Sequence, residues 1–506
     1  MAILRKRYKY KTVRHNQFPV RHNLVCRNTK LQYFYTVIKK QTDMQPLFKI
    51  IFKLAFLLAT VIASAQDISG TWKGALNVPG MELPVAFNIS ETDGTYSATL
   101  DSPKQNAFGI PIDKTTFENN KLTVTQSQMG MEYTATYEDG IFKGTFKQGG
   151  QTFPLDLKKG EKEVKKIKPQ EPKKPYPYAV EEVIFENAKA GNIKFSGTLT
   201  LPKNVKNPPV AILISGSGPQ NRDEELMGHK PFLVLADHLT RQGIAVLRYD
   251  DRGTAKSEGD FSVATSFDFA TDVEAAMAYL QTRKDVDTNK IGLVGHSEGG
   301  LIAPIVAARN KKVAFCVLLA GPGVDGKEVL LTQGKRAAEL EGYPAIDIKN
   351  SQKASAKIFD IAANYEGEKS KKEIMAIFQD LKAKMTYEKA KAEFTEKAMK
   401  QQAEMITSPW MQTFIGYDPQ TSLQKVNCPV LAVNGEKDFQ VLPELNLNAI
   451  QKGLKHNNDV TIKQFKDLNH LFQTSKTGAL SEYSEIEETF APVALNYISS
   501  WINERF

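Results

Sequence analysis

The chain is poor in cysteine, with three among 506 residues. Cys26 lies in a basic N-terminal leader, so only Cys316 and Cys428 remain in the rest of the chain. Each of these two lies in an apolar run typical of a strand, where cysteines are mostly buried free thiols. The sequence therefore excludes a disulfide framework and indicates a fold that depends on its apolar core.

The leader in turn lacks acidic residues. The first 65 residues hold 13 Lys and Arg but a single Asp, whereas the whole chain has a net charge of +9, so the remaining 441 residues carry −3. The basic surplus that nucleic-acid binding requires is absent outside the leader. We expect no nucleic-acid partner.

The leader has no uncharged apolar run of the roughly 20 residues that span a membrane. Its apolar run, residues 54–62, follows lysines at positions 49 and 53 and ends in the small residues 63–65. This pattern is typical of a secretory signal peptide that begins at Met44 and is cleaved after Ala65. No cysteine follows the cleavage point, which argues against a lipid anchor. We expect a secreted or periplasmic protein without a membrane partner after cleavage.

Residues 1–43 look like neither a signal nor a domain. We interpret them as an upstream extension from a start codon assigned too early, and a long N-terminal extension is the alternative.

Short alternating segments fill residues 66–158, separated by turn sequences such as "TDG", "EDG" and "QGG". Strands at this spacing predict a small antiparallel domain, a barrel or a sandwich. It contains no recognisable chemistry, so we interpret it as a spacer or a substrate-positioning module. Residues 159–180 are rich in Lys and Pro, which predicts a solvated linker.

From residue 181 to 506 strands alternate with helices. Two antiparallel strands come first, and apolar runs follow at 209–214, 244–250, 291–295, 313–321, 429–435 and 460–465. This order predicts a mostly parallel sheet covered by helices on both faces. A charged helical insert, at about 325–420, is predicted to form a cap.

The stretch "GHSEGG" places Ser297 between Gly295 and Gly299. An apolar strand precedes it and an apolar helix follows it, which is the context of a nucleophile elbow. The glycines allow close backbone approach around a serine held in a strained turn. Ser297 is therefore the candidate nucleophile.

A serine hydroxyl needs a base, and the base needs an orienting acid. His470 follows the last predicted strand, at the sheet edge that carries the elbow. We prefer it to His456, which precedes that strand. The histidines at 229 and 238 lie upstream, and His296 lies within the elbow itself, where it cannot reach its neighbour's hydroxyl.

The acid is expected in a loop between serine and histidine in chain order. Asp438, in "NGEKDFQVLP", follows the run 429–435. Glu436 and Asp467 are its rivals, and we prefer Asp438.

The oxyanion hole requires two backbone N–H groups. One is predicted at Glu298, directly after the nucleophile. The other is predicted at Ser217, in the glycine-rich loop "SGSGPQNRDEE".

The motifs "ISGSGPQNRD", "RYDDRGTAKS", "GHSEGG", "NGEKDFQVLP" and "NHLFQ" occur in this order and together resemble the α/β-hydrolase superfamily. Within it they are similar to secreted bacterial EstD-like esterases, which are akin to the serine aminopeptidase and prolyl-iminopeptidase group. The resemblance covers residues 180–506 and implies a Ser297–Asp438–His470 triad with oxyanion donors at Ser217 and Glu298.

The chain departs from the superfamily at one point of this resemblance. Ser215-Gly216 stands where the superfamily usually has His-Gly. By the same likeness, Asp251 and Arg252 are expected to brace the loop structurally.

These features predict an exported serine carboxylesterase acting on small ester substrates, with Trp410 and Phe414 as acyl-side walls. One alternative is an exported serine aminopeptidase of the prolyl-iminopeptidase kind, and another is a non-catalytic binding protein on a hydrolase fold. We expect no cofactor and no metal, because "RDEELMGH" has no recognised ligand spacing.

Overall fold

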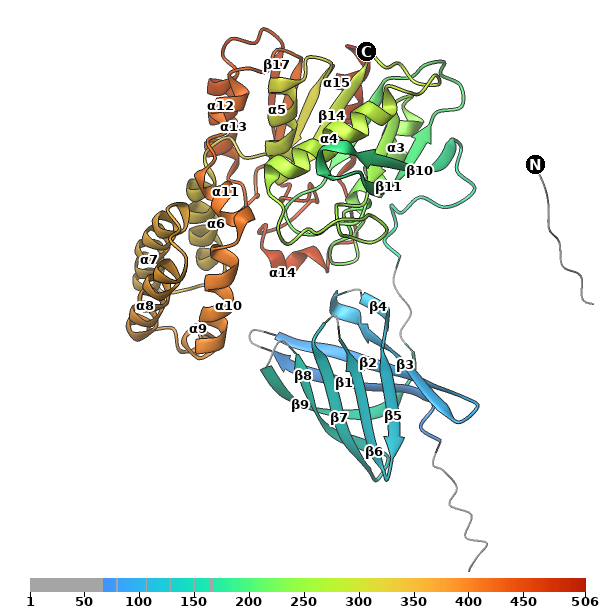
Figure 1. Ribbon diagram of the computed structural model, residues 1–506, viewed down its shortest axis with the longest axis vertical. Coiled ribbons are helices and arrows are strands. Elements are labelled where there is room, and N and C mark those ends of the chain that lie inside the picture. Colours follow the sequence, from blue (N-terminus) through green and yellow to red (C-terminus); the bar gives the residue numbers. More distant parts are fainter. Residues whose placement is uncertain (1–66, 79–80, 106, 128, 149–150, 163–166) are drawn as a thin grey trace, which may run out of the picture. The chain divides into compact units, whose positions relative to one another are not determined.

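The computed structural model describes residues 67–506, apart from 79–80, 106, 128, 149–150 and 163–166. These residues form an antiparallel β domain, a connecting segment and an α/β domain (Figure 1). The predicted signal peptide, residues 44–65, and the preceding extension lie outside the described residues. In the part of the chain that the structure describes, no helix is both long enough and apolar enough to cross a membrane.

The N-terminal domain is a single antiparallel sheet, as predicted, with the strand order β4-β3-β2-β1-β9-β8-β7-β6-β5. Its strands are β1 (Gly70–Val78), β2 (Met81–Thr92), β3 (Thr95–Ser102), β4 (Ala107–Pro111), β5 (Lys114–Glu118), β6 (Lys121–Gln126), β7 (Met131–Glu138), β8 (Ile141–Gln148) and β9 (Gln151–Gly160), with a 3-10 turn η1 (Pro103–Gln105). Alternate side chains of these strands are buried on one face. Trp72 is central to this core and meets the Phe142 ring edge-on, with 4.5 Å between the ring centroids.

The connecting segment differs from the predicted solvated linker. Lys168 donates to the carbonyl oxygens of Ser484 and Ile486, at 2.9 and 2.6 Å. The Tyr178 hydroxyl donates to Asp237 at 2.7 Å. The Lys168 side chain thus satisfies backbone carbonyl groups of the α/β domain. Composition alone does not predict such specific contacts. Residues 168–178 are fastened to that domain.

The α/β domain contains a sheet with the strand order β10-β11-β13-β12-β14-β15-β16-β17. Strands β12 to β17 run parallel to one another, and the hairpin β10–β11 pairs antiparallel to β13. The strands are β10 (Ala179–Asn187), β11 (Ile193–Leu201), β12 (Val210–Ile214), β13 (Ala245–Tyr249), β14 (Ile291–His296), β15 (Cys316–Leu319), β16 (Val430–Gly435) and β17 (Val460–Phe465), with a 3-10 turn η2 (Ala188–Ala190).

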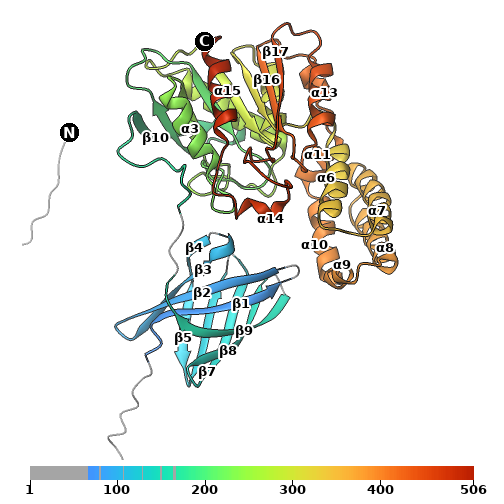
Figure 2. The ribbon, with the colours of Figure 1, turned by 180° about the vertical axis from the view of Figure 1, so that it is seen from behind.

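Helices cover both faces of this sheet. On one face α4 (Ser266–Leu280), α5 (Glu298–Arg309) and α13 (Pro443–Gly453) share an apolar core with the strands. On the other face lie α3 (Pro231–Arg241) and α15 (Pro492–Asn503) (Figure 2). Burial on both faces explains why the central strands are apolar throughout rather than alternating. The carboxyl ends of the parallel strands therefore meet at one edge, where loops carry the candidate site.

A helical insert lies between β15 and β16. Its helices are α6 (Gly326–Leu340), α7 (Ala345–Ala363), α8 (Glu368–Lys384), α9 (Glu388–Glu393), α10 (Glu396–Ile406) and α11 (Pro409–Gly416). They share an apolar cluster of their own around Ile374 and Phe378, which are almost fully buried. The short helices α12 (Gln420–Leu423) and α14 (Leu480–Tyr483) complete the domain.

Candidate active site

Ser297 lies in the turn between β14 and α5, with φ 53° and ψ −117°. A residue with a side chain rarely adopts this backbone conformation, and it costs about 1–3 kcal/mol where it occurs. Such strain persists only where the surrounding structure enforces it. Here the Ser297 N–H donates to the Leu319 carbonyl of the neighbouring strand at 2.8 Å. The sharp turn is the geometry expected of a nucleophile elbow.

The positions of Gly295 and Gly299, beside Ser297, have no room for a side chain. A Cβ added to Gly295 would lie 2.0 Å from the Gly299 carbonyl oxygen, and one added to Gly299 would lie 2.1 Å from the Ile214 carbonyl oxygen. Both distances are far inside van der Waals contact. The sequence pattern around Ser297 therefore reflects the close crossing of β12, β14 and α5.

His470 and Asp438 form a buried pair. Nδ1 of His470 lies 2.7 Å from Oδ2 of Asp438, and the two residues are 4% and 2% exposed. The other Asp438 oxygen accepts the backbone N–H groups of Gln440 and Val441, at 2.8 and 3.0 Å. A carboxylate at Nδ1 favours the proton on that nitrogen and leaves Nε2 as an acceptor. This arrangement suits a general base.

The His470 ring is held beside the elbow through His296. The two imidazole centroids are 4.8 Å apart, and Nε2 of His296 lies 3.0 Å from the His470 carbonyl oxygen. Among the described residues the Ser297 hydroxyl makes no hydrogen bond to His470. In ligand-free sites such bonds are often long and shorten only when substrate is bound.

The rival acids point elsewhere. Asp467 is partly exposed and forms an ion pair with Lys437 at 2.7 Å, while Glu436 accepts the Asp467 backbone N–H at 3.1 Å. The rival base His456 is exposed and bonds to the Val426 carbonyl at 3.0 Å. Within the part of the chain that is described, none of the three forms a hydrogen bond or an ion pair with the His470 ring.

The loop after β12 approaches the elbow closely. A Cβ added to Gly216 would lie 3.2 Å from the Cβ of Ser297. The next residue, Ser217, is exposed. Glu298 occupies the first turn of α5, where backbone N–H groups have no helical partner. Glu298 thus follows the nucleophile directly and Ser217 follows a residue that lies close to it, while their role as oxyanion donors stays a prediction.

Asp251 braces this loop from the end of β13. Its carboxylate accepts from the Ser215 hydroxyl at 2.7 Å and from the Gln220 N–H at 2.9 Å. Burial raises the pKa of Asp251 well above its usual range. Arg252 instead forms a buried ion pair with Asp272 of α4 at 2.7 Å. The two residues brace different neighbours.

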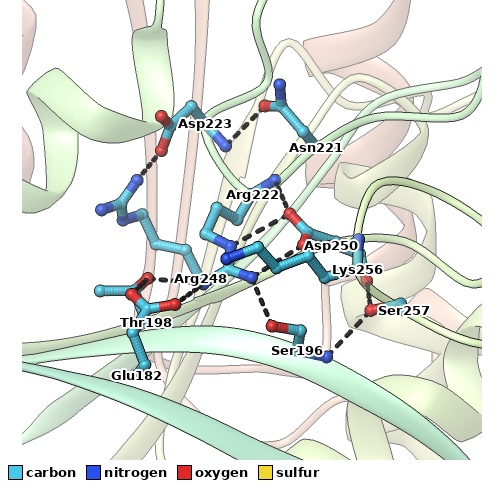
Figure 3. A network of polar contacts seen from close by, with 10 residues as sticks. All are labelled: Glu182, Ser196, Thr198, Asn221, Arg222, Asp223, Arg248, Asp250, Lys256 and Ser257. Atoms are coloured by element: carbon cyan, nitrogen blue, oxygen red, sulfur yellow. Dashed lines mark hydrogen bonds and ion pairs between the residues drawn. The ribbon is translucent and has the colours of Figure 1, made fainter. Parts of the chain in front are cut away.

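A second set of contacts fastens the loop to β13 and β11 (Figure 3). Asp250 accepts from the Arg222 guanidinium at 2.8 and 3.0 Å and from the Arg222 backbone N–H at 2.9 Å. Asp223 accepts from Arg248, whose burial lowers its pKa to about 10. Arg222 also donates to Thr198 of β11, at 2.7 Å. Such a network holds the loop in one conformation before substrate arrives.

The Glu298 side chain has a role that the sequence did not reveal. Its carboxyl is buried and accepts from the Ser266 hydroxyl at 2.6 Å and from the Trp410 indole N–H at 2.8 Å. Burial raises its pKa. Trp410 belongs to α11 and stacks on Phe414, with 5.4 Å between the ring centroids. The insert is therefore tied directly to the elbow.

A small cavity of about 20 Å³ adjoins the elbow and is lined by Ser215, Gly216, Asp251 and Glu298, among others. The described residues contain no cluster of three His, Cys, Asp or Glu side chains arranged to hold a metal ion.

Comparison with known proteins gives one family and several relatives. The profile of the family described as "Serine aminopeptidase, S33" matches residues 230–475. Esterase EstD of Thermotoga maritima is 28% identical over 275 residues, which cover 54% of this chain and 57% of EstD. The chain thus spans little more than half the length of that curated relative.

Two solved structures have a similar chain trace. The esterase Pf2001 of Pyrococcus furiosus is 15% identical with a TM-score of 0.39, covering 65% of this chain and 93% of that one. Est1E of Butyrivibrio proteoclasticus, solved with ferulic acid bound, is 18% identical with a TM-score of 0.37, covering 64% of this chain and 98% of that one.

Proposed function

Because the chain is an esterase-like α/β-hydrolase, we propose that it is an exported serine carboxylesterase that hydrolyses short acyl esters through an acyl-enzyme intermediate. The observation that carries this proposal is the strained Ser297 turn at the sheet edge that also holds the His470–Asp438 pair. Nucleophile, base and orienting acid are the three groups that acyl transfer by serine requires.

In the proposed reaction the Ser297 hydroxyl oxygen attacks the ester carbonyl carbon while Nε2 of His470 takes the hydroxyl proton. The resulting oxyanion is stabilised by the backbone N–H groups of Ser217 and Glu298. His470 then gives its proton to the departing alcohol, which leaves Ser297 acylated. Water, deprotonated by His470, releases the acid and restores the serine. The net reaction converts ester and water to acid and alcohol.

The character of the insert favours small acyl groups. Many of its apolar side chains pack into an internal cluster around Ile374 and Phe378, and the insert is rich in Lys and Glu. A broad apolar lid for long chains is not formed by such helices. Trp410 and Phe414 remain as candidate walls for a short acyl chain.

A serine aminopeptidase is the second candidate, because the matched family profile carries that description. Amide cleavage by the same groups additionally requires protonation of a poor amine leaving group and a site for the substrate's free amine. A non-catalytic binding protein on this fold would need neither protonation of a leaving group nor a site for a free amine.

The experiment compares kcat/KM of the purified protein on p-nitrophenyl acetate and butyrate with that on proline p-nitroanilide. We expect the esters to be cleaved far faster, and Ser297→Ala to abolish both activities. A higher kcat/KM on the anilide would favour the aminopeptidase, and no turnover of any substrate would favour the binding protein.

Export is part of the proposal and rests on the sequence pattern of residues 44–65. N-terminal sequencing of the protein recovered from the periplasm or medium should give a chain beginning at Gln66. An intact residue 1 would contradict it.

A further inference from the structure

His296 has a polar partner at each of its ring nitrogens although it is only 6% exposed. Nδ1 lies 2.9 Å from Oε1 of Glu224, and Nε2 lies 3.0 Å from the His470 carbonyl oxygen. The same Glu224 oxygen accepts the Gly216 backbone N–H at 2.8 Å. The loop after β12, the elbow and the loop after β17 therefore meet at one imidazole ring.

The partners of His296 determine where its protons are. A carbonyl oxygen can only accept, so Nε2 of His296 must donate to His470. An ionised Glu224 carboxylate has no proton to donate, so its Oε1, which already accepts from an amide, accepts from Nδ1 as well. Both nitrogens then carry protons, and the ring is an imidazolium. The geometry agrees with the raised pKa of His296, where the attraction of Glu224 opposes the effect of burial.

A second buried histidine in the same domain provides the contrast. His229 also directs Nε2 to a carbonyl, that of Tyr483 at 2.9 Å, but its Nδ1 faces the Thr489 hydroxyl at 2.9 Å. A hydroxyl can donate, so this ring needs only one proton. Burial lowers the pKa of His229 to about 4. The carboxylate partner, rather than burial, distinguishes the two rings.

We propose that Glu224 and His296 form a buried ion pair that positions the oxyanion loop and the His470 loop around Ser297. This inference rests on the proposed hydrolase function and assigns two positioning residues to it. Glu224 fixes Gly216, whose Cβ position lies 3.2 Å from the Cβ of Ser297. His296 fixes the backbone of the candidate base.

The surroundings make each partner depend on the other. Oε2 of Glu224 is buried without a hydrogen-bond partner in the described part of the chain, so its negative charge is compensated mainly through Oε1. Removing one member of a buried pair leaves an uncompensated charge, which is far costlier than the loss of a surface pair.

The other titratable groups near the ring are His470 and Asp438, and Asp251 lies near Glu224 and Glu298. Burial raises the pKa of both Asp251 and Glu298, which favours their neutral forms. Glu224 is therefore the counter-ion that sits directly on the imidazolium.

The charge state is tested by ¹⁵N NMR of histidine-labelled protein at pH 7.5, with His296→Gln to assign the signal. We expect both His296 nitrogens to give protonated signals, while His229 in the same spectrum is neutral. In Glu224→Gln, which keeps the side-chain shape and an acceptor oxygen, His296 should become neutral. A neutral His296 in the unaltered protein would overturn the ion pair whether or not the protein hydrolyses esters.

The positioning role is tested on p-nitrophenyl butyrate. Glu224→Gln should lower kcat about 10-fold and Glu224→Ala about 100-fold with little change in KM, because the oxyanion loop acts in the transition state. His238→Gln, whose ring bonds to Ser499 outside the site at 3.0 Å, is the matched control and should keep kcat. Unchanged kcat in Glu224→Gln would overturn positioning even if Glu224→Ala failed to fold. An unaltered protein without hydrolase activity would refute the proposed function and the positioning role together, and the NMR result would still decide the ion pair.

Discussion

The indole N–H of Trp410 donates a hydrogen bond of 2.8 Å to the carboxyl of Glu298, the residue that follows Ser297 in the chain. A helix of the insert and the turn that holds the candidate nucleophile are thus joined by one polar contact in a buried setting. The contact couples the position of the insert, which would form a wall of the substrate site, to the position of Ser297, which would attack the substrate.

Trp410→Phe should therefore weaken both stability and substrate binding. Loss of the buried hydrogen bond is expected to cost about 1–3 kcal/mol, and KM should rise more than kcat falls because the insert is less firmly placed. Urea unfolding and p-nitrophenyl butyrate kinetics measure the two effects. The control is Trp501→Phe, which removes a comparable indole bond to Thr461 at 2.9 Å on the far side of the sheet. If both variants change KM equally, the contact has no special link to the site.

Asp438→Asn should reduce kcat by about 10⁴-fold, because the amide no longer orients the His470 ring in the required tautomer. Asp467→Asn removes only a partly exposed ion pair with Lys437, so kcat should stay within about threefold. Steady-state kinetics of the two variants decide between them. A larger loss in Asp467→Asn would show that the acid has been assigned to the wrong residue.

Gly216→Ala should lower kcat about 10- to 100-fold while the protein still folds. The new methyl group would lie 3.2 Å from the Ser297 Cβ and 3.3 Å from Oε1 of Glu224, so the loop must shift away from the nucleophile. Gly334→Ala, within α6 and with nothing within 4 Å of the added atom, is the matched control. It should stabilise the protein by about 0.5–1 kcal/mol through helix propensity and leave kcat unchanged. Normal kcat in Gly216→Ala would contradict a close oxyanion loop.

Stability should fall in weak acid because of His229. Its ordinary pKa of 6.5 is lowered by burial to about 4, so the unfolded chain binds the proton more readily than the folded one. The stabilising contribution is fully present above pH 6.5 and is lost as the pH falls toward 4. The difference between these two pKa values corresponds to a contribution of about 3 kcal/mol to the free energy of unfolding.

The pH dependence of urea unfolding for the unaltered protein and for His229→Gln measures this contribution. The variant should lose less stability than the unaltered protein between pH 6.5 and 4, and the exposed His456→Gln should behave like the unaltered protein. Parallel curves for all three would rule out His229 as the source.

Local patterns in the sequence predicted the strands well, since apolar runs bounded by turn residues need no knowledge of distant contacts. The run 291–295 became β14 and the run 460–465 became β17. The run 313–321 gave only the four residues of β15, although Ala314, Phe315 and Ala320 also make backbone hydrogen bonds to the neighbouring strands. Strand order did not follow from the runs, because β13 lies outside β12 in the sheet.

Helix starts were harder to predict. Ser370 and Glu373 have the spacing of a capping box, which predicts a helix beginning after Ser370. In the structure α8 begins at Glu368, and the buried Ser370 hydroxyl accepts the Glu366 N–H from within the first turn. Spacing alone does not determine which of several polar residues occupies the cap.

In the candidate site, too, some residues could be predicted from local sequence patterns and others could not. Ser297, Asp438 and His470 each follow a strand, and the edge where parallel strands end brings such positions together. Glu224 gave no signal, because it meets His296 across 72 positions of the chain and lies in a loop whose path depends on Arg222 and Asp250. Contacts of this kind depend on tertiary packing, so they leave no periodic pattern in the sequence.

The most direct test of the central claim is covalent labelling with diethyl p-nitrophenyl phosphate, which leaves a diethylphosphoryl group on an activated serine and releases p-nitrophenol. Peptide mass mapping should place one adduct on Ser297, ester hydrolysis should fall in proportion to labelling, and Ser297→Ala should take up none. An ester-hydrolysing protein that remains unlabelled, or that is labelled at another residue while Ser297→Ala keeps its activity, would contradict the account.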